Sequence, residues 1–254
     1  MDPYEIINLT QWNPIGRQIT YILIAVAGAI LFTHLTILLL TRSYKRKYDY
    51  INRYEIRLLW YVSLFLVASA AFYVNTLAPD VGLLWLVVQV FVTAMMGLIA
   101  ALFFNNVLRF YYPFYVEKRL KKLRYKPRKS PKSGKPMKLL TEDEEDVYLD
   151  EGMQAEENVF SIDYDVWIDE ETDYTMIEKY RGHLHALQCP ECKYQTFKVT
   201  KEEILESPSE NEEGELLKFF QCDYCKYKER RAFKIAKLKY IKTPDTNTNK
   251  AISV

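Results

Sequence analysis

Three long apolar runs occupy the first part of the chain, and a charged region follows them. The runs cover Ile19–Leu40, Leu58–Leu77 and Leu83–Phe104, and none of them contains Asp, Glu, Lys or Arg. About 20 apolar residues in a helix cross the roughly 30 Å of hydrocarbon in a bilayer. The pattern therefore predicts a membrane domain over residues 18–116 with three transmembrane helices. The short turn at 79–82 makes the second and third spans a helical hairpin.

The positions of the basic residues predict the orientation of the spans. Lys and Arg are frequent in the connection 42–57 and in the segment after residue 109, whereas the turn at 79–82 has none. Cytoplasmic loops carry such an excess of Lys and Arg. We therefore expect residues 1–17 to be a short extracytoplasmic segment, and everything after about residue 109 to lie in the cytoplasm.

Among the polar side chains in and directly after the predicted spans, four are candidates for a site: His34, Gln89, Asn105 and Asn106. Polar groups in a membrane are costly and often line the path of an ion or a proton. They also serve as hydrogen-bond partners between helices. No carboxylate and no inverted repeat accompanies them in the predicted spans, which favours the second interpretation over a carrier.

The composition shows that apolar and charged residues lie in separate parts of the chain. The totals of 34 Lys plus Arg and 33 Asp plus Glu nearly cancel, while 49% of the residues are hydrophobic. The separation excludes one uniform globular domain, a disulfide-rich scaffold and a wholly disordered chain. Residues 117–140 form a basic membrane-proximal segment suited to anionic lipid, and residues 141–187 begin with an acidic stretch that disfavours nucleic acid.

The acidic region also contains signals for secondary structure. Thr141 followed by Glu144 forms a capping-box pattern, which predicts a helix over about 142–158. After it, the stretches 160–171 and 174–182 alternate between apolar and polar residues. Such alternation is typical of strands, so we expect these two stretches to pair as a hairpin.

The chain has four cysteines, which form two matched pairs. The pairs are Cys189 with Cys192 and Cys222 with Cys225. Two such turns supply the four thiolates of a tetrahedral Zn²⁺ site. Strand-like stretches follow at 194–200 and 233–241, so residues 188–242 predict a zinc ribbon with one structural Zn²⁺ per chain. A charged loop at Ser207–Gly214 forms its tip, and residues 243–254 are expected to be a flexible tail.

Other chemistry for the thiols remains open at this point. A pair of redox-active thiols requires a βαβ setting that the pattern does not contain, and a reducing cytoplasm disfavours disulfides. His183 and His185 precede Cys189 and are alternative ligands. Four cysteines already complete a tetrahedron, which leaves no open position for a metal-bound water, so we expect a structural and not a catalytic metal.

The tail resembles a known family. The stretch 130–167 and the later KYRGHLHALQCPECKYQTF look like the cytoplasmic tail of bacterial TPM-domain membrane proteins. The resemblance implies paired ribbons and a bacterial inner-membrane setting, although the TPM domain itself has no counterpart here. It also implies that the first ribbon has lost its metal, because its four ligand positions are occupied by Ser130, Ser133, Asp169 and Thr172. Hydroxyls and one carboxylate are a weak zinc set.

These observations lead to three hypotheses of function. The favoured one is a non-enzymatic integral membrane protein whose zinc-ribbon tail binds another protein, as a scaffold or accessory subunit, with self-association in the bilayer as a variant. No phosphate-binding loop, HExxH or GxSxG motif is present, and the chain has only 3 histidines. The alternatives are an oligomeric transport component and binding of nucleic acid. The last would use five basic residues: Arg230, Arg231, Lys234, Lys237 and Lys239.

Overall fold

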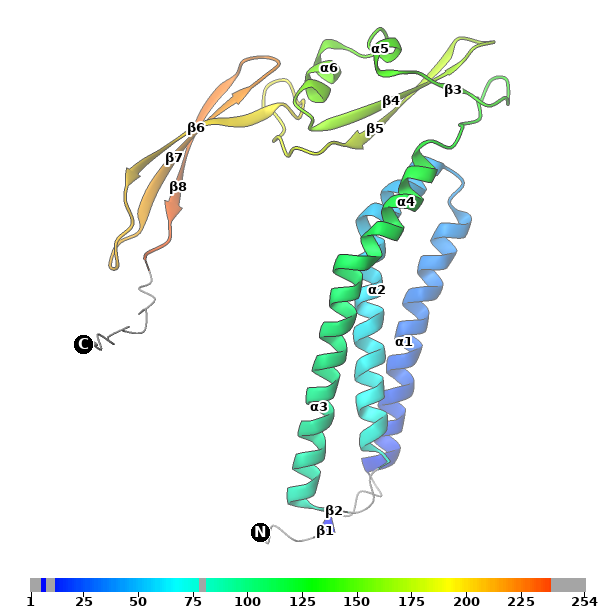
Figure 1. Cartoon of the computed structure of the whole chain (residues 1–254), viewed down its shortest axis with the longest axis vertical. Coiled ribbons are helices and arrows are strands. Elements are labelled where there is room, and N and C mark those ends of the chain that lie inside the picture. Colours follow the sequence, from blue (N-terminus) through cyan, green and yellow to red (C-terminus); the bar gives the residue numbers. More distant parts are fainter. Residues whose placement is uncertain (1–5, 8–11, 78–80, 239–254) are drawn as a thin grey trace, which may run out of the picture. The chain divides into compact units, whose positions relative to one another are not determined.

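The computed structural model describes residues 6–7, 12–77 and 81–238 (Figure 1). The chain divides into two compact units, with the boundary between Arg128 and Lys129. The predicted basic segment 117–140 therefore contributes to both units. Each unit is described by itself.

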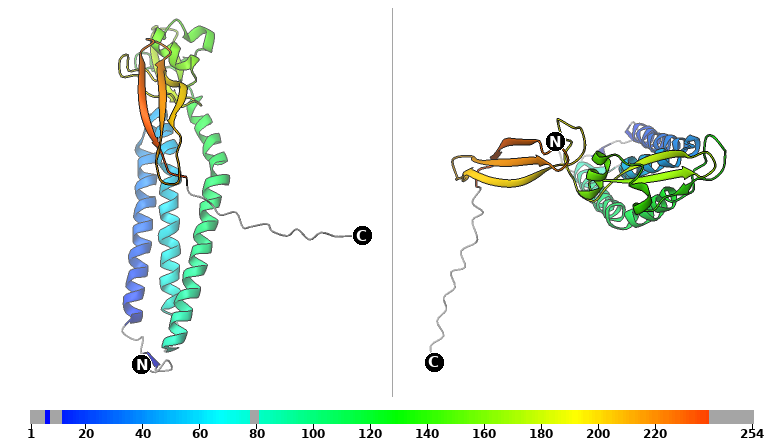
Figure 2. Two further views of the ribbon diagram at one scale, coloured as in Figure 1. Left: turned by 90° about the vertical axis from the view of Figure 1, so that its left-hand side faces the viewer. Right: turned by 90° about the horizontal axis from the view of Figure 1, so that it is seen from above.

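The first unit is built from long helices. They are α1 (Trp12–Leu40), α2 (Tyr44–Asn75), α3 (Leu83–Asn106) and α4 (Tyr112–Arg124), with a π-helical turn η1 (Val107–Tyr111) between the last two. Figures 1 and 2 show α2 between α1 and α3. Two short strands, β1 (Ile6–Ile7) and β2 (Val81–Gly82), pair antiparallel.

The three apolar helices of the prediction are confirmed. They are long and apolar enough to cross a membrane, and only 11%, 11% and 0% of their apolar windows are buried within the protein. Apolar side chains that face outward over several helical turns are stable only in an apolar environment. This unit is therefore suited to a membrane.

The prediction of a connection over 42–57 is wrong. The turn between α1 and α2 is three residues long, because Ser43 caps α2 by accepting a hydrogen bond from the backbone N–H of Arg46 at 3.4 Å. The following residues continue the helix, with Ile51 and Glu55 buried against neighbouring helices. Except for Arg42, which lies in the turn, the basic residues of this segment therefore lie on the first turns of α2.

The third helix also continues further than its apolar run. Helical structure extends through η1 and α4 to Arg124. Pro113 lies in the first turn of α4, where it has no N–H to donate to the carbonyl four residues earlier, and a π-helical turn is one way in which a helix absorbs this loss. Val116 and Leu120 of α4 then pack with Ile51 of α2 in a buried cluster.

The second unit contains two three-stranded antiparallel sheets. The first has the order β3 (Lys138–Leu139), β4 (Ile162–Asp169) and β5 (Tyr174–Arg181). The predicted hairpin of β4 and β5 is present. The residues at the centre of its core are Leu149, Ile162, Tyr164 and Val166.

The single helix predicted over 142–158 is two helices in the structure. The capping box of Thr141 and Glu144 opens a short helix, α5 (Glu142–Glu145), which ends within one turn. Asp150 then caps α6 (Glu151–Asn158) by accepting a hydrogen bond from the backbone N–H of Met153 at 2.7 Å. A second N-cap starts a new helix, which is why the prediction of one helix fails.

The second sheet has the order β6 (Phe197–Glu206), β7 (Gly214–Cys222) and β8 (Lys228–Ile235). The outer strands overlap the predicted strand-like stretches, and the predicted tip lies between β6 and β7. The middle strand β7 was not among the predicted strands. The sheet is one layer, and the Cys189 turn is joined to it by a bridge between Leu187 and Phe197.

Candidate metal centre

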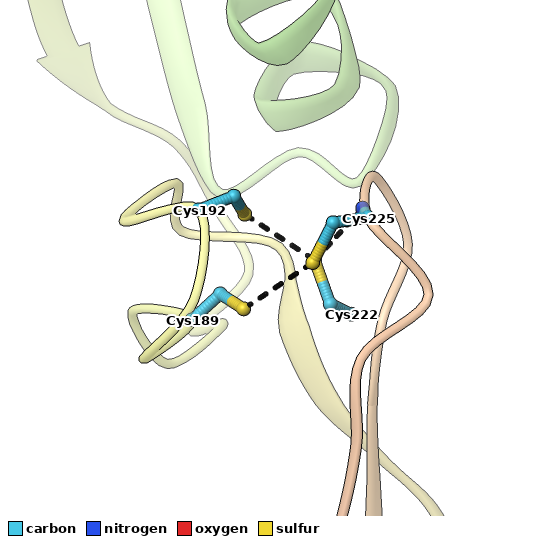
Figure 3. Close-up of side chains that lie close together, drawn as sticks. All are labelled: Cys189, Cys192, Cys222 and Cys225. Atoms are coloured by element: carbon cyan, nitrogen blue, oxygen red, sulfur yellow. Dashed lines mark hydrogen bonds between the residues drawn. The ribbon is translucent and has the colours of Figure 1, made fainter.

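The four cysteines meet at one end of the second sheet. Figure 3 shows their side chains pointing toward one another, two from the turn before β6, one from the end of β7 and one from the turn that follows it. The Sγ atoms of Cys189 and Cys225 lie 3.6 Å apart, those of Cys192 and Cys222 lie 3.7 Å apart, and all four lie within 4.8 Å of one another. A tetrahedron with metal–sulfur distances of about 2.3 Å has edges of about 3.8 Å. The donor set therefore fits one tetrahedral metal ion.

Hydrogen bonds in the site favour the thiolate form of Cys222. The hydroxyl of Thr196 lies 3.0 Å from its sulfur, and the backbone N–H of Cys225 donates to the same sulfur at 3.4 Å. Burial raises the pKa of this thiol, but hydrogen bonds from Thr196, Cys225 and Tyr224 together outweigh burial and lower the pKa to about 6. A thiolate is the form that binds a metal.

The sheet has little apolar core apart from the cysteines. Its buried cluster contains Phe197 and Phe220 together with Cys189 and Cys222. Burying one Phe contributes only about 1.5–3 kcal/mol, which is small against the cost of about 1–2 kcal/mol for each residue ordered. A bound metal can contribute about 10 kcal/mol or more to such a fold. A metal bound by the four cysteines would therefore add stability that the small apolar core does not supply.

The arrangement favours coordination over the alternatives. All four cysteines are free thiols. His183 and His185 are exposed and do not belong to the cluster of possible ligands. A four-thiolate set has no open coordination position for a substrate or an activated water.

Four turns in the second unit have the same local conformation. Within each, two side chains three residues apart face a common centre, and the next residue has a positive φ: Gly134 (72°), Asp173 (51°), Lys193 (67°) and Lys226 (62°). In three of them the first residue donates its N–H to the carbonyl five residues later: Ser130 to Lys135, Cys189 to Tyr194 and Cys222 to Tyr227. The first residue of the fourth turn is Asp169, and its partner in the strand ladder is Tyr174, which also lies five residues later.

The two turns without cysteines converge on the carboxylate of Asp169. Ser133 and Thr172 donate hydrogen bonds to its Oδ2 at 2.7 and 2.6 Å. Hydrogen bonds from Ser130, Thr172 and Ser133 hold the pKa of Asp169 well below its usual range. The four residues that the family resemblance assigns to a lost metal site therefore do lie together, and hydroxyl groups surround a carboxylate there. That they once held a metal stays a prediction.

Glu156 connects the first sheet to the cysteine turns. Its side chain is fully buried and accepts hydrogen bonds from the hydroxyl of Tyr164 and, at 2.9 and 2.5 Å, from Nζ of Lys179 and the backbone N–H of Gln195. Gln195 precedes Thr196, the residue that contacts the sulfur of Cys222. The cysteine cluster is thus linked through Thr196 and Gln195 to Glu156, and through Glu156 to β4 and β5.

α6 packs closely against the turn that contains Cys189 and Cys192. A Cβ atom on Gly152 would lie 2.2 Å from the ring of Tyr194, so a larger residue there would displace this ring. The hydroxyl of Tyr194 donates to the carboxylate of Asp150 at 3.1 Å, and Ser161 donates to the carbonyl of Gln195 at 2.5 Å. The two sheets of this unit are therefore packed through polar and aromatic contacts beside the metal centre.

In the helical unit, the structure places His34 beside a carboxylate that the sequence analysis missed. His34 Nε2 lies 3.8 Å from Glu55, and His34 Nδ1 lies 3.2 Å from the hydroxyl of Tyr50. Glu55 is 1% exposed and also accepts hydrogen bonds from Tyr112 at 2.6 Å and from Arg119 at 2.9 Å. The spacing of seven residues from Glu55 to the buried Val62 and Ser69 is the signal that would have placed it on a helix face.

The other predicted polar residues of the spans are not part of this cluster. Gln89 contributes only its backbone carbonyl to a hydrogen bond from Thr93, whose hydroxyl accepts a bond from Asn75. Asn105 and Asn106 lie at the end of α3, and among the described residues His34 contacts Tyr50 and Glu55 and neither of these two amides. The structure therefore does not gather the four residues at one site.

Only some of the basic residues considered for binding nucleic acid form ion pairs. Arg231 pairs with Glu229 at 2.8 Å, and Lys234 pairs with Glu213 at 3.2 Å. Arg230 and Lys237 are exposed, and Lys239 lies outside the described residues. Half of the described set is thus neutralised by neighbouring carboxylates.

Comparison of the chain with protein-family models, with curated proteins and with solved structures finds no match. The geometry of the site therefore carries the functional argument alone.

Proposed function

We propose that this is a non-enzymatic integral membrane protein whose metal-stapled tail binds another protein, as a scaffold or an accessory subunit of a membrane complex. The observation that carries the proposal is the cluster of four thiols within 4.8 Å at the end of a one-layer sheet. A complete set of ligands stabilises structure and leaves no position for a substrate. The metal would stabilise a sheet whose outer strands have free edges, and such edges can bind another chain.

The metal in this proposal is Zn²⁺, one per chain, and the fold around it is a zinc ribbon. Cys189, Cys192, Cys222 and Cys225 would hold the ion. Four thiolates in a tetrahedron are a set that zinc favours. When bound, the ion would supply folding free energy and not reactivity. Thr196 and the backbone N–H of Cys225 would support the ligand Cys222 from outside the metal's own shell.

The proposed setting is a bacterial inner membrane with the N-terminus outside and the metal-binding unit in the cytoplasm. The basic residues on the first turns of α2 and on α4 support this orientation, because such residues accumulate on the cytoplasmic side. The four free thiols agree with a reducing compartment. The resemblance of the tail to TPM-domain proteins agrees with the same setting and stays a prediction.

A transport or channel component is the second candidate, and the contact of His34 with Glu55 is the observation in its favour. A buried ionisable pair between helices is typical of proton and ion paths. Arg119 and Tyr112 already bind the carboxylate of Glu55, however, which favours a structural ion pair. Flux that is unchanged when His34 is replaced by alanine would remove this candidate.

Affinity purification of the full-length protein from its membranes in mild detergent, followed by mass spectrometry, tests the proposal. We expect a second protein in stoichiometric amount, and we expect it to be lost when Cys189 and Cys222 are both replaced by serine. The matched control is Glu171→Gln, which changes an exposed residue of the same unit. Recovery of the protein alone, as a defined oligomer, would contradict the proposal and favour the transport candidate.

A further inference from the structure

The outer edge of β8 is one of the two outer edges of the metal-bearing sheet, the other being that of β6. β8 runs over eight residues and pairs with β7 along its whole length, from Lys228 opposite Gln221 to Ile235 opposite Gly214. In the described part of the chain no strand pairs with its other side. Every second residue of an edge strand directs its N–H and C=O away from the sheet, where they are open to another chain.

Two basic side chains lie on one face of this edge without an ion pair. Residues directly opposite each other in a sheet share a face, so Lys228 lies with Gln221 and Arg230 lies with Phe219. Both basic side chains are exposed, and no salt bridge to either is formed among the described residues. On the other face, by contrast, Arg231 is held by Glu229 at 2.8 Å.

A hollow adjoins these two residues on the sheet. Its volume is about 420 Å³, and its lining includes Lys201, Phe219, Lys228 and Arg230. Nζ of Lys201 lies 5.8 Å from the centre of the half-buried ring of Phe219. The hollow therefore lies beside the free edge of β8 and combines the ring of Phe219 with the cations of Lys228 and Arg230, while Lys201 on its other side is paired with Glu203, and Glu229 also lines it.

The charges on β8 also decide which strand can pair with it. Four basic residues stand against one Glu on β8, so the strand carries a net positive charge. An acidic strand would meet unpaired cations at Lys228 and Arg230. The edge thus favours a partner of opposite charge.

We propose that the outer edge of β8 binds an extended segment of the partner protein with acidic side chains at alternate positions, as a fourth strand of the sheet. The backbone of the segment would complete the ladder, and its carboxylates would lie beside Lys228 and Arg230. This inference rests on the proposed function and names the surface and the kind of partner.

The test uses the full-length, metal-loaded protein in a neutral detergent and a fluorescent peptide of eight alternating Val and Glu residues. We expect the peptide to bind, as measured by fluorescence anisotropy, and a peptide of alternating Val and Lys not to bind. The double variant Lys228→Glu/Arg230→Glu should weaken binding by about tenfold or more. The control Lys121→Glu/Lys122→Glu makes the same change of charge on α4 and should leave binding unchanged.

A second probe separates strand addition from attraction between charges. Methylation of alternate backbone nitrogens of the Val–Glu peptide removes ladder hydrogen bonds and keeps every carboxylate, so it should abolish binding. Equal binding of the methylated peptide would overturn the proposal, as would equal weakening by the two double variants. Binding of single-stranded oligothymidylate in place of the Val–Glu peptide, lost in Lys228→Glu/Arg230→Glu, would overturn the proposal and assign the hollow to nucleic acid.

The same variants distinguish this inference from the proposed function. Lys228→Glu/Arg230→Glu should retain its metal, because neither residue is among the cysteine ligands. If a partner still co-purifies with this variant in full amount, the partner docks elsewhere, and the edge assignment fails while the proposed function stands. If no partner co-purifies with the unmodified protein, the proposed function fails first.

Discussion

The buried carboxylate of Glu156 accepts a hydrogen bond at 2.5 Å from the backbone N–H of Gln195, and this bond joins α6 to the turn that carries Cys189 and Cys192. The same carboxylate binds Lys179 of β5. The two sheets of the second unit thus share one polar centre. Order in the cysteine turns should therefore depend on the first sheet.

Replacing Glu156 with alanine tests this dependence. The change leaves the buried hydroxyl of Tyr164 and the N–H of Gln195 without an acceptor, which should lower the free energy of unfolding by about 2–5 kcal/mol. It should also weaken metal binding, measured by competition with a chelator. Glu171→Ala is the control, because its ion pair with Lys135 is exposed and contributes about 1 kcal/mol or less. Unchanged metal affinity in Glu156→Ala would contradict the coupling.

Much of this fold follows from local pattern. Hydropathy located the three apolar helices, and spacing located the four cysteines, because both signals are local in the sequence. The extension of α2 back to Tyr44 was missed because the charged residues hid the face formed by Ile51 and Glu55. The roles of Glu55 and Glu156 depend on partners more than 20 residues away, such as Arg119 for Glu55 and Gln195 for Glu156. No local pattern contains such contacts.

Glu145 should make the stability of the second unit depend on pH. Burial raises the pKa of its carboxyl group to about 7, although the backbone N–H of Val166 donates to it. Because the folded pKa is higher than the unfolded one, the folded state binds the proton more tightly. Its contribution is fully present below the unfolded value of about 4.5 and is lost as pH rises toward 7.

The variant Glu145→Gln keeps an oxygen that can accept the bond from Val166 and has no charge. Urea unfolding should therefore show a shallower loss of stability between about pH 4.5 and 7 than the unmodified protein shows. A slope identical to that of the unmodified protein would contradict the assignment.

Asp169 should make stability depend on pH in the opposite direction. Its pKa is held low by the hydroxyls of Ser130, Thr172 and Ser133, so its contribution is present above the unfolded value of about 3.8 and is lost as pH falls below that value. Asp169→Asn should remove this acid sensitivity from the first sheet, which hydrogen exchange of β4 and β5 would report. Persistence of the full acid loss in the variant would show that other carboxylates cause it.

The shared conformation of the four turns leads to a constructive test. If the turns of Ser130 and Asp169 are equivalent to the cysteine turns, cysteine at positions 130, 133, 169 and 172 together should create a second tetrahedral thiolate set. Elemental analysis of the quadruple variant should then find two metal ions per chain. A folded variant that still binds one metal would show that the two centres differ in geometry.

In the helical unit, Glu55→Gln should destabilise the packing of α4 on α2. The change removes the charge that binds Arg119, and the expected loss is on the order of 2 kcal/mol, since Arg119 is 44% exposed and stays partly hydrated. Thermal unfolding in detergent measures the effect. Glu117→Gln, on an exposed position of α4, is the matched control, and an equal change in both variants would contradict a special role for Glu55.

Removal of the metal should affect the second sheet and spare the helices. With a core of Phe197, Phe220 and two cysteines, the sheet should lose protection when a strong chelator is added. Hydrogen exchange with mass spectrometry should show faster exchange in β6, β7 and β8 and no change in α1 to α3. Equal protection of the sheet with and without chelator would show that it folds without a metal.

The most direct test of the account is the metal content of the purified full-length protein. One zinc ion per chain is predicted, with none in Cys222→Ser, whose helical unit should remain folded in detergent. Absence of metal from the unmodified protein would contradict the metal-stapled docking surface. Two ions per chain would contradict the interpretation of the Ser130, Ser133, Asp169 and Thr172 centre as metal-free.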